Sequence, residues 1–473
     1  MISYIFKMLK SFRPVFSHRS TWLVFCMVIL GFLGSSEMIG VTSFCRFFGL
    51  DTKGYYSLLY FFRYSTWSLS ALVSFWTTFV LSQNMHILFA GRAILIGDHT
   101  YVPKDGRRMP GVVTLRQNSE TQSKPSYFRG HCWGTIAVLI GNLNNSFCLP
   151  LYSLIHQGFV HIGEEKKQKE NRKTLGTRII QMALDIAVNN NLPSILILDA
   201  YFPSGAIFIL VNSVWSIKLK EPFIHLIVRA KKNYIAYFQP TNDSTKRVGR
   251  PAKYGEKIKL MEMFDHPHLF SKVKCCVYGR YEEIMIMSSD MLWKPAGFLI
   301  RFVFAKTSRG PIILMCSNLT ADPVVALEFY CSRIRIECMY DMLKNLIGSF
   351  CYRFWSKMMP KESRKPKRNK NLKSPRYENI ITIKNCWEAC EKFVMLGSIS
   401  LGLLQLIALK YTESVWEKFE GFLRTQSREI PSERTVKRVL SKILVKKLYN
   451  LAPNGILREI MNQFLEKSKA AST

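Results

Sequence analysis

Two apolar runs of this sequence each end in an aspartate, and they constrain the fold more than any other feature. Residues 93–97 precede Asp98, and residues 194–198 precede Asp199. A short, uninterrupted apolar run is typical of a strand that helices cover on both faces. We therefore expect two buried strands in a helix-covered sheet, each with a carboxylate where it ends.

The surrounding sequence predicts an α/β fold. One helix is expected over about residues 171–190, ahead of Asp199. Strands that first form hairpins and then alternate with helices are typical of a mixed sheet. Helices are expected at both ends of the chain, including one over about residues 55–81. Further apolar runs predict strands at residues 134–141, 147–156, 298–306 and 311–317.

A third acidic residue, Glu337, lies in a segment with helical periodicity. At about 100° per residue, Arg333, Glu337 and Lys344 all fall within about 60° of Tyr330 on a helical wheel. The four side chains would therefore share one stripe of a single helix. A different stripe would face the core, because apolar residues gather there: Val325, Phe329, Ile336, Met339, Leu343 and Leu346.

The start of this helix can also be predicted. Asp322 is a favourable capping residue, and Pro323 suits the first helical position. One helix would thus carry both a functional face and a packing face.

The charge of the chain indicates a polyanionic partner. Lys and Arg total 66 against 33 Asp and Glu, so the net charge is +33. Such an excess causes self-repulsion in the compact state and favours binding to a polyanion. Nucleic acid and the anionic face of a membrane are the two candidates.

Cysteines and apolar segments bear on the compartment. The 12 cysteines lack zinc-site spacings, and we expect reduced thiols in the cytoplasm. Residues 22–33 and 393–409 are uncharged and resemble membrane spans; the first also has the basic flank of a signal peptide. We interpret both as buried helices and expect no membrane association.

We divide the chain into regions at changes of composition. Residues 1–90 would be a helical N-terminal region, either a DNA-binding module or a cap on the core. Residues 234–290 read as an insertion, 351–380 as a basic linker and 381–473 as a helical C-terminal region. The core would comprise residues 91–233 and 291–350. Residues 357–376 hold nine Lys or Arg and one acid, so the linker either tracks a nucleic-acid backbone or is merely solvated.

Three carboxylates suit metal-assisted cleavage of phosphodiester bonds. This chemistry requires acidic side chains that hold two ions about 3.5–4 Å apart. Oxygen ligands favour magnesium or manganese over zinc. Asp98 and Asp199, on adjacent strands, would meet at one sheet edge, and Glu337 would complete the cluster.

The spacing of Tyr330, Arg333, Glu337 and Lys344 resembles the signature of bacterial insertion-sequence transposases of the DDE type, in the insertion-sequence-four group. The sequences around the two aspartates, Gly-Asp-His-Thr at 97–100 and Leu-Asp-Ala-Tyr-Phe at 198–202, are similar to members of that group. So is Gly-Arg-Pro-Ala-Lys-Tyr-Gly at 249–255. The resemblance covers about residues 90–350 and includes His99, where many relatives carry an acid or a small residue.

The resemblance implies a ribonuclease-H-like catalytic core with a mostly β insertion. Asp98, Asp199 and Glu337 would be catalytic and would bind two Mg²⁺ or Mn²⁺ ions. The other three signature residues, Tyr330, Arg333 and Lys344, would hold DNA phosphates near the transposon end. Relatives are endonucleases that cut at the element's ends, join the 3′-hydroxyl to target DNA, and work as dimers in the bacterial cytoplasm at the nucleoid.

Three further residues have two readings each. Arg250 would enter a DNA minor groove or lie in a solvated loop. Trp293 would stack on a flipped base or pack in the core. His131 would act as a general base or be structural, and we favour the structural role for both aromatic side chains.

Two other functions remain as alternatives to a transposase that acts on double-stranded DNA. One is an inactive copy or a stand-alone nuclease that binds DNA. The other is a basic membrane-associated protein with two spans, which the two uncharged runs would supply.

Overall fold

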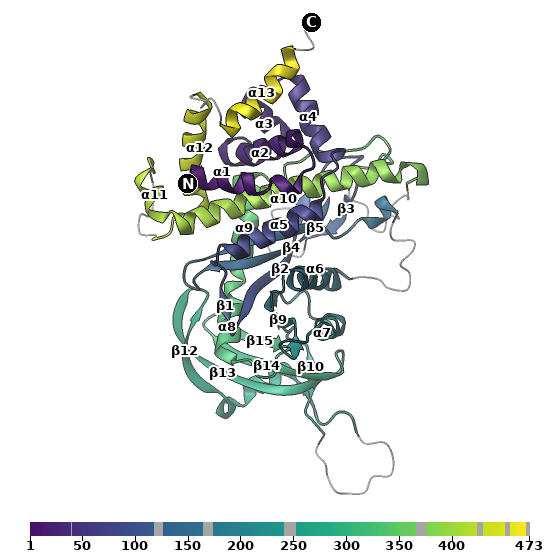
Figure 1. Ribbon diagram of the computed structural model, residues 1–473. Coiled ribbons are helices and arrows are strands. Elements are labelled where there is room, and N and C mark those ends of the chain that lie inside the picture. Colours follow the sequence, from purple (N-terminus) through teal and green to yellow (C-terminus); the bar gives the residue numbers. More distant parts are fainter. Residues whose placement is uncertain are drawn as a thin grey trace.

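The structure is a computed structural model that describes residues 1–38, 40–117, 126–163, 174–240, 252–365, 375–422, 429–449 and 455–469. Its architecture is α/β, with a mixed sheet and flanking helices, as the sequence predicts. In Figure 1 the sheet occupies the lower part of the molecule, and a helical layer formed by both ends of the chain lies above it.

Five strands form the centre of the sheet. Their spatial order is β5 (Ser146–Ile155), β4 (Tyr127–Gly141), β2 (Arg92–Pro103), β6 (Ser194–Leu198) and β9 (Ile224–Arg229). Three of them, β2, β4 and β5, are antiparallel neighbours, with the short strand β3 (Val113–Arg116) between β2 and β4 in the chain, and the other two, β6 and β9, run parallel to β2. The apolar run at 194–198 is thus a buried strand, as predicted.

The sheet continues beyond β9 through three long antiparallel strands, β15 (Gly310–Cys316), β14 (Phe298–Thr307) and β13 (Arg280–Trp293). The region boundary expected between residues 290 and 291 falls inside β13. The remaining strands are short or peripheral: β1 (Leu88–Phe89), β3 (Val113–Arg116), β7 (Trp215–Ser216), β8 (Glu221–Pro222), β10 (Ile235–Tyr237), β11 (Lys257–Lys259) and β12 (Ser271–Val277).

Helices cover both faces of the central strands. On one face lie α6 (Leu175–Asn189) and α7 (Gly205–Asn212), and on the other lie α8 (Pro323–Ser332) and α9 (Ile334–Met342). Gly97 allows α6 to approach β2 closely, because an added Cβ would lie 3.2 Å from Cγ1 of Ile179 and 2.8 Å from Cδ2 of Leu198.

The predicted start of the Glu337 helix is confirmed, but the prediction of one continuous helix is wrong. The Asp322 carboxylate accepts the Val325 N–H at 2.9 Å, and Pro323 is the first residue of α8. Arg333 then interrupts the helix: its N–H donates to the carbonyl of Tyr330, three residues back rather than four. A π-helical turn follows α9 at Leu343–Ile347. A wheel with uniform spacing contains neither irregularity.

The N-terminal region is helical: α1 (Ile2–Ser11), α2 (Arg19–Gly34), α3 (Val41–Phe48), α4 (Thr52–Arg63) and α5 (Leu69–Ser82). The expectation of a single helix over residues 55–81 is wrong, because a non-helical segment separates α4 from α5. Ser68 begins α5 by accepting the N–H of Ala71 at 3.2 Å. This capping serine is the signal that the periodicity did not reveal.

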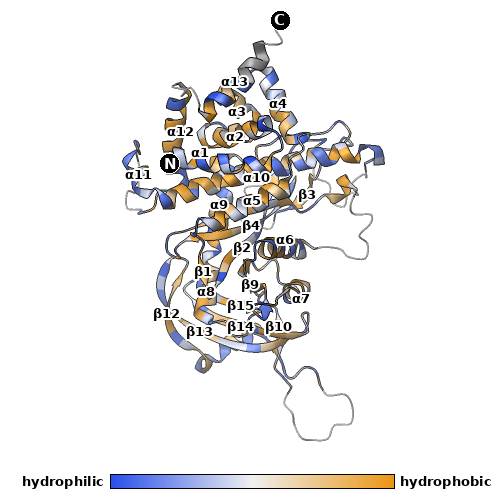
Figure 2. Ribbon diagram, in the orientation of Figure 1, coloured by the Kyte–Doolittle hydropathy of each residue, from blue (hydrophilic) through white to orange (hydrophobic). Residues whose placement is uncertain are grey.

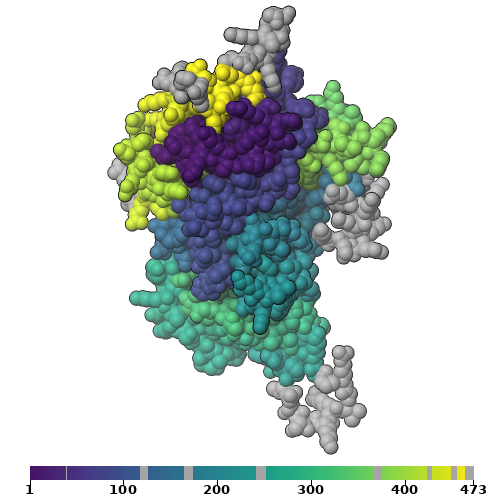
Figure 3. Space-filling model, viewed as in Figure 1, coloured from purple at the N-terminus to yellow at the C-terminus, as the bar shows by residue number. Residues whose placement is uncertain are grey.

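Both ends of the chain pack around one long helix, α10 (Ile380–Lys410), which contacts β5, α2 and α4. Apolar residues run along α10 in Figure 2, and the N- and C-terminal segments meet at one end of the molecule in Figure 3. The chain ends with α11 (Thr412–Glu417), α12 (Glu433–Tyr449) and α13 (Ile456–Lys469).

The two uncharged runs that resemble membrane spans lie in α2 and α10, and both are buried. Among the described helices, the one over Tyr377–Lys410 is long and apolar enough to cross a membrane, and 94% of its apolar window is buried inside the protein. Residues 366–374 of the predicted basic linker lie outside the described residues.

Candidate functional site

Asp98 and Asp199 lie at the same level of two neighbouring parallel strands. Ile96 of β2 is paired with Ile197 of β6, and each aspartate follows two residues later. β6 ends before Asp199, whereas β2 continues to Pro103, so the expectation that a strand ends at Asp98 is wrong. Beyond that level β2 pairs only with β4, which opens the sheet edge where the two carboxylates lie.

Arg333 joins all three predicted acidic residues. Its Nη1 lies 3.2 Å from Oδ2 of Asp98, its Nε lies 3.9 Å from Oδ1 of Asp199, and its Nη2 lies 2.7 Å from Oε1 of Glu337. Arg333 lies at the junction of α8 and α9, and its side chain lies over the sheet edge. Three carboxylates that are far apart in the sequence converge on one guanidinium.

Short hydrogen bonds orient the aspartates. The N–H of His99 donates to the Asp98 carboxylate at 2.7 Å, and the N–H of Ala200 donates to the Asp199 carboxylate at 2.7 Å. The Tyr330 hydroxyl donates to Asp199 at 3.3 Å. Tyr330 is only 2% exposed, so in this structure it supports a carboxylate from within the core.

Burial and charge shift the protonation of the cluster. Burial raises the pKa of Asp98 to about 7, although Arg333 and the His99 N–H act in the opposite direction. Burial acts to lower the pKa of Arg333, but the carboxylates of Asp199 and Asp98 raise it above its ordinary value. Arg333 thus stays charged and serves as the counterion of the cluster.

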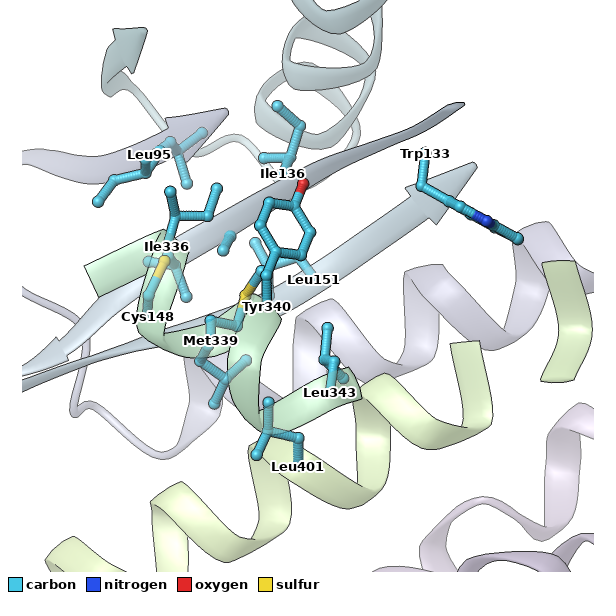
Figure 4. Close-up of a cluster of buried hydrophobic side chains, with 14 of the residues drawn as sticks. Leu95, Trp133, Ile136, Cys148, Leu151, Ile336, Met339, Tyr340, Leu343 and Leu401 are labelled. Carbon is cyan, nitrogen blue, oxygen red and sulfur yellow. The ribbon is translucent and has the colours of Figure 1, made fainter. Parts of the chain in front are cut away.

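The last signature residue, Lys344, binds β2 two residues beyond Asp98. Its Nζ donates to the Thr100 hydroxyl at 2.6 Å, and Thr100 follows Asp98 on the same face of the strand. The apolar side of α9 packs against the sheet in Figure 4, where Ile336, Met339 and Tyr340 lie near strand residues. This packing fixes the height of Glu337 and Lys344 over β2.

The carboxylates suit a hard divalent cation by chemistry, but their present arrangement is an ion-pair cluster. Oxygen ligands of this kind bind Mg²⁺ or Mn²⁺. However, no group of three His, Cys, Asp or Glu side chains within the described ranges is placed to hold a metal ion. The guanidinium of Arg333 contacts each carboxylate through a different nitrogen and so lies where their charges meet.

Glu337 also faces an open groove of about 1110 Å³. The groove runs between the turn that precedes β5, the exposed side of α9 and the start of α12, and Arg335 and Arg434 are among its lining residues. The side chain of Glu337 is 51% exposed, while that of Asp98 is 18% exposed. The side chain of Asp199 is 37% exposed, so both Glu337 and Asp199 are more open to solvent than Asp98.

Three other predicted residues lie away from the cluster or outside the described residues. His131 is fully buried in β4, where its ring nitrogens lie near the Tyr352 hydroxyl and the Pro110 carbonyl. Trp293 is 3% exposed and stacks on Tyr234. Both positions agree with structural roles. Arg250 lies outside the described residues.

Several partners of the site were not predicted from the sequence. The Tyr340 hydroxyl donates to the main-chain carbonyl of Asp98 at 2.8 Å and ties α9 to β2. The ring of His99 points to the other face of the sheet, with Nε2 2.7 Å from Nδ1 of His156. Strand alternation could have placed Thr100 beside Asp98, but Tyr340 and His156 depend on tertiary packing.

All twelve cysteines lie in the described part of the chain and are free thiols.

Comparison with protein-family models gave no match, and neither did comparison with curated proteins.

Proposed function

We propose that this protein is a DNA transposase of the DDE type, which cuts double-stranded DNA at the ends of its element and joins them to target DNA. The observation that carries the proposal is the convergence of Asp98, Asp199 and Glu337 on one sheet edge. The sequence signature and the net charge of +33 support the same substrate.

The finer fold proposed here is a ribonuclease-H-like core. Three antiparallel strands followed by two strands parallel to the first, with helices on both faces, agree with that arrangement. The β-rich insertion expected at residues 234–290 would hold β10, β11, β12 and most of β13; β14 and β15, which were expected in the core, continue the same antiparallel part of the sheet and would extend the insertion.

The three carboxylates would hold two Mg²⁺ or Mn²⁺ ions, which activate the attacking oxygen and stabilise the leaving oxygen when bound. Arg333 shields the carboxylates from one another in their absence. Its planar guanidinium can also bind a phosphate through two parallel hydrogen bonds. We propose that Arg333 exchanges carboxylates for a DNA phosphate, while Lys344 adds a point charge and Tyr330 keeps Asp199 in place.

One observation favours a second function, a protein that binds DNA without cutting it. Arg333 already pairs with all three carboxylates, as it would in a copy that no longer takes up metal ions. Measuring whether the unaltered protein nicks DNA separates the two functions. For the active protein we further propose a homodimer on DNA and a location in the bacterial cytoplasm at the nucleoid.

The test is magnesium-dependent nicking of duplex DNA that carries the sequences flanking the coding region. Asp98→Asn, Asp199→Asn and Glu337→Gln should each abolish nicking and leave DNA binding largely intact. Asp341→Asn is the matched control, because Asp341 is an exposed acid one turn further along the same helix, hydrogen-bonded to Asn345. Nicking that survives in the Glu337→Gln protein would contradict the assignment. Binding without nicking in the unaltered protein would favour the second function.

A further inference from the structure

Cationic side chains line another groove, which has a volume of about 700 Å³. The groove lies between the residues that follow β2 and the segment that follows the π-helical turn. Among the described residues that line it, Asp105 is the only acid. We call its six cationic residues the basic groove: Lys104, Arg107, Arg108, Arg353, Lys361 and Arg364.

One wall of the groove is an extended segment with alternating burial. Tyr352, Phe354 and Ser356 point into the protein, while Arg353 and Trp355 between them are exposed. Trp355 is 48% exposed. The segment therefore presents an aromatic ring next to cations.

The wall is held in place by cations that bind neutral carbonyls. Lys104 Nζ donates to the carbonyl of Tyr352 at 3.0 Å, and Arg108 Nη1 donates to that of Lys357 at 2.6 Å. Arg107 Nε donates to the carbonyl of Glu362 at 3.0 Å.

Carbonyls fix the geometry of these side chains without cancelling their charge. Within the described ranges, no side chain of the basic groove forms an ion pair with a carboxylate. A preformed concavity with uncompensated positive charge attracts a polyanion.

β2 connects the basic groove to the candidate active site. Asp98 lies within β2, and Thr100, which is bound by Lys344, lies two residues further along the strand. Lys104 directly follows the last residue of β2. At a rise of about 3.3 Å per residue, six residues span about 20 Å. This distance equals about six base pairs of duplex DNA, at about 3.4 Å for each phosphate of one strand.

We propose that the basic groove binds the sugar-phosphate backbone of the same double-stranded DNA, about six base pairs from the position that is cut. Arg353, Lys361 and Arg364 contact phosphates, and the ring of Trp355 packs against a deoxyribose. The inference rests on the proposed function, because it assigns part of the substrate to this surface.

The test measures DNA affinity as a function of salt in the Glu337→Gln background, so that cutting does not interfere. The triple variant Arg353→Gln, Lys361→Gln, Arg364→Gln removes three exposed charges. Its slope of log affinity against log salt should be shallower by about 2 to 3, and its affinity at low salt at least tenfold weaker. Trp355→Ala should weaken binding and leave the slope unchanged, because the ring carries no charge.

The matched control is Lys218→Gln, Lys220→Gln, Lys446→Gln, which changes the net charge equally at exposed positions between β7 and β8 and in α12. It should retain the slope of the parent. Equal slopes in the groove variant and the control would overturn the proposal. So would loss of binding to phosphatidylserine vesicles with unchanged DNA binding, which would assign the surface to membranes. Failure of the proposed function is a separate result, namely no nicking by the unaltered protein.

Discussion

Arg333 is the residue that compensates the negative charge of the carboxylate cluster when no metal ion is bound. Its side chain is 14% exposed and contacts three acidic groups, so it is both a structural counterion and a candidate phosphate ligand. Removing one member of a fully buried ion pair typically costs about 3–5 kcal/mol, and an exposed pair contributes about 0–1 kcal/mol, so this partly buried cluster should lose an amount between the two. The cluster should therefore be sensitive to this one residue.

We expect Arg333→Gln to destabilise the metal-free protein and to make its stability depend on divalent ions. The three carboxylates would repel one another without the guanidinium, and Mn²⁺ could then take its place. Thermal unfolding with and without Mn²⁺ measures this. The ion should raise the melting temperature of the variant more than that of the unaltered protein, by the amount that binding to the folded state alone contributes.

Arg333→Lys is the matched control, since it keeps one charge but not the planar fork. Its response to Mn²⁺ should fall between the other two. An Arg333→Gln protein whose melting temperature does not respond to Mn²⁺ would show that these carboxylates do not bind the ion.

The three acidic residues were predicted from the sequence, but the geometry of their side chains was not. Asp98 and Asp199 follow apolar runs, and periodicity put Glu337 near Arg333. The role of Tyr330 could not be read in this way, because a wheel gives a direction but not the depth of burial. The ion pairs of Arg333 to both aspartates depend on tertiary packing, which a single sequence does not contain.

Among the elements, α8 and α9 place the site. Packing of Leu327 and Phe329 against the sheet sets one helix, and Ile336 and Met339 set the other. Arg333 lies between the two helices, and its side chain reaches Asp98 within β2 and Asp199 just after β6. The positions of Arg333 and Glu337 therefore depend on where α8 begins.

Asp322→Ala should lower the free energy of unfolding by about 1 kcal/mol, because the first turn of α8 loses its capping acceptor. Urea denaturation measures the loss. Asp322→Asn keeps a side-chain oxygen and should retain most of the stability. If Asp322→Ala unfolds at the same urea concentration as the unaltered protein, the cap does not stabilise α8.

Regular elements were predictable where a local signal marks them. The buried strand at 194–198 and the Asp322 cap were found because composition and capping chemistry are local. The break between α4 and α5 and the interruption at Arg333 were not found, because apolar periodicity resumes directly after each, although residues 64–68 include two serines and a threonine. The adjacency of the two aspartate-bearing strands was predicted and is confirmed by the pairing of β2 with β6, but the order of the other strands was not predicted, since pairing partners are distant in the sequence.

In the molecule as a whole, α10 joins both ends of the chain to the sheet. It lies against β5 on one side and against α2 and α4 on another, so the terminal regions share one core with the candidate catalytic part. The uncharged run that resembles a membrane span is the centre of this packing. Composition predicted the buried helix, but not that the N- and C-terminal regions would meet around it.

The central claim is that Asp98, Asp199 and Glu337 together hold divalent ions. Fe²⁺ can replace Mg²⁺ at such oxygen ligands and, with ascorbate and peroxide, cleaves the polypeptide next to the ion. Mapping of the fragments should show cuts near residues 98, 199 and 337 that excess Mg²⁺ suppresses and that the Asp98→Asn, Glu337→Gln double variant lacks. Cuts elsewhere, or cuts unchanged by Mg²⁺ and by the double variant, would contradict the account.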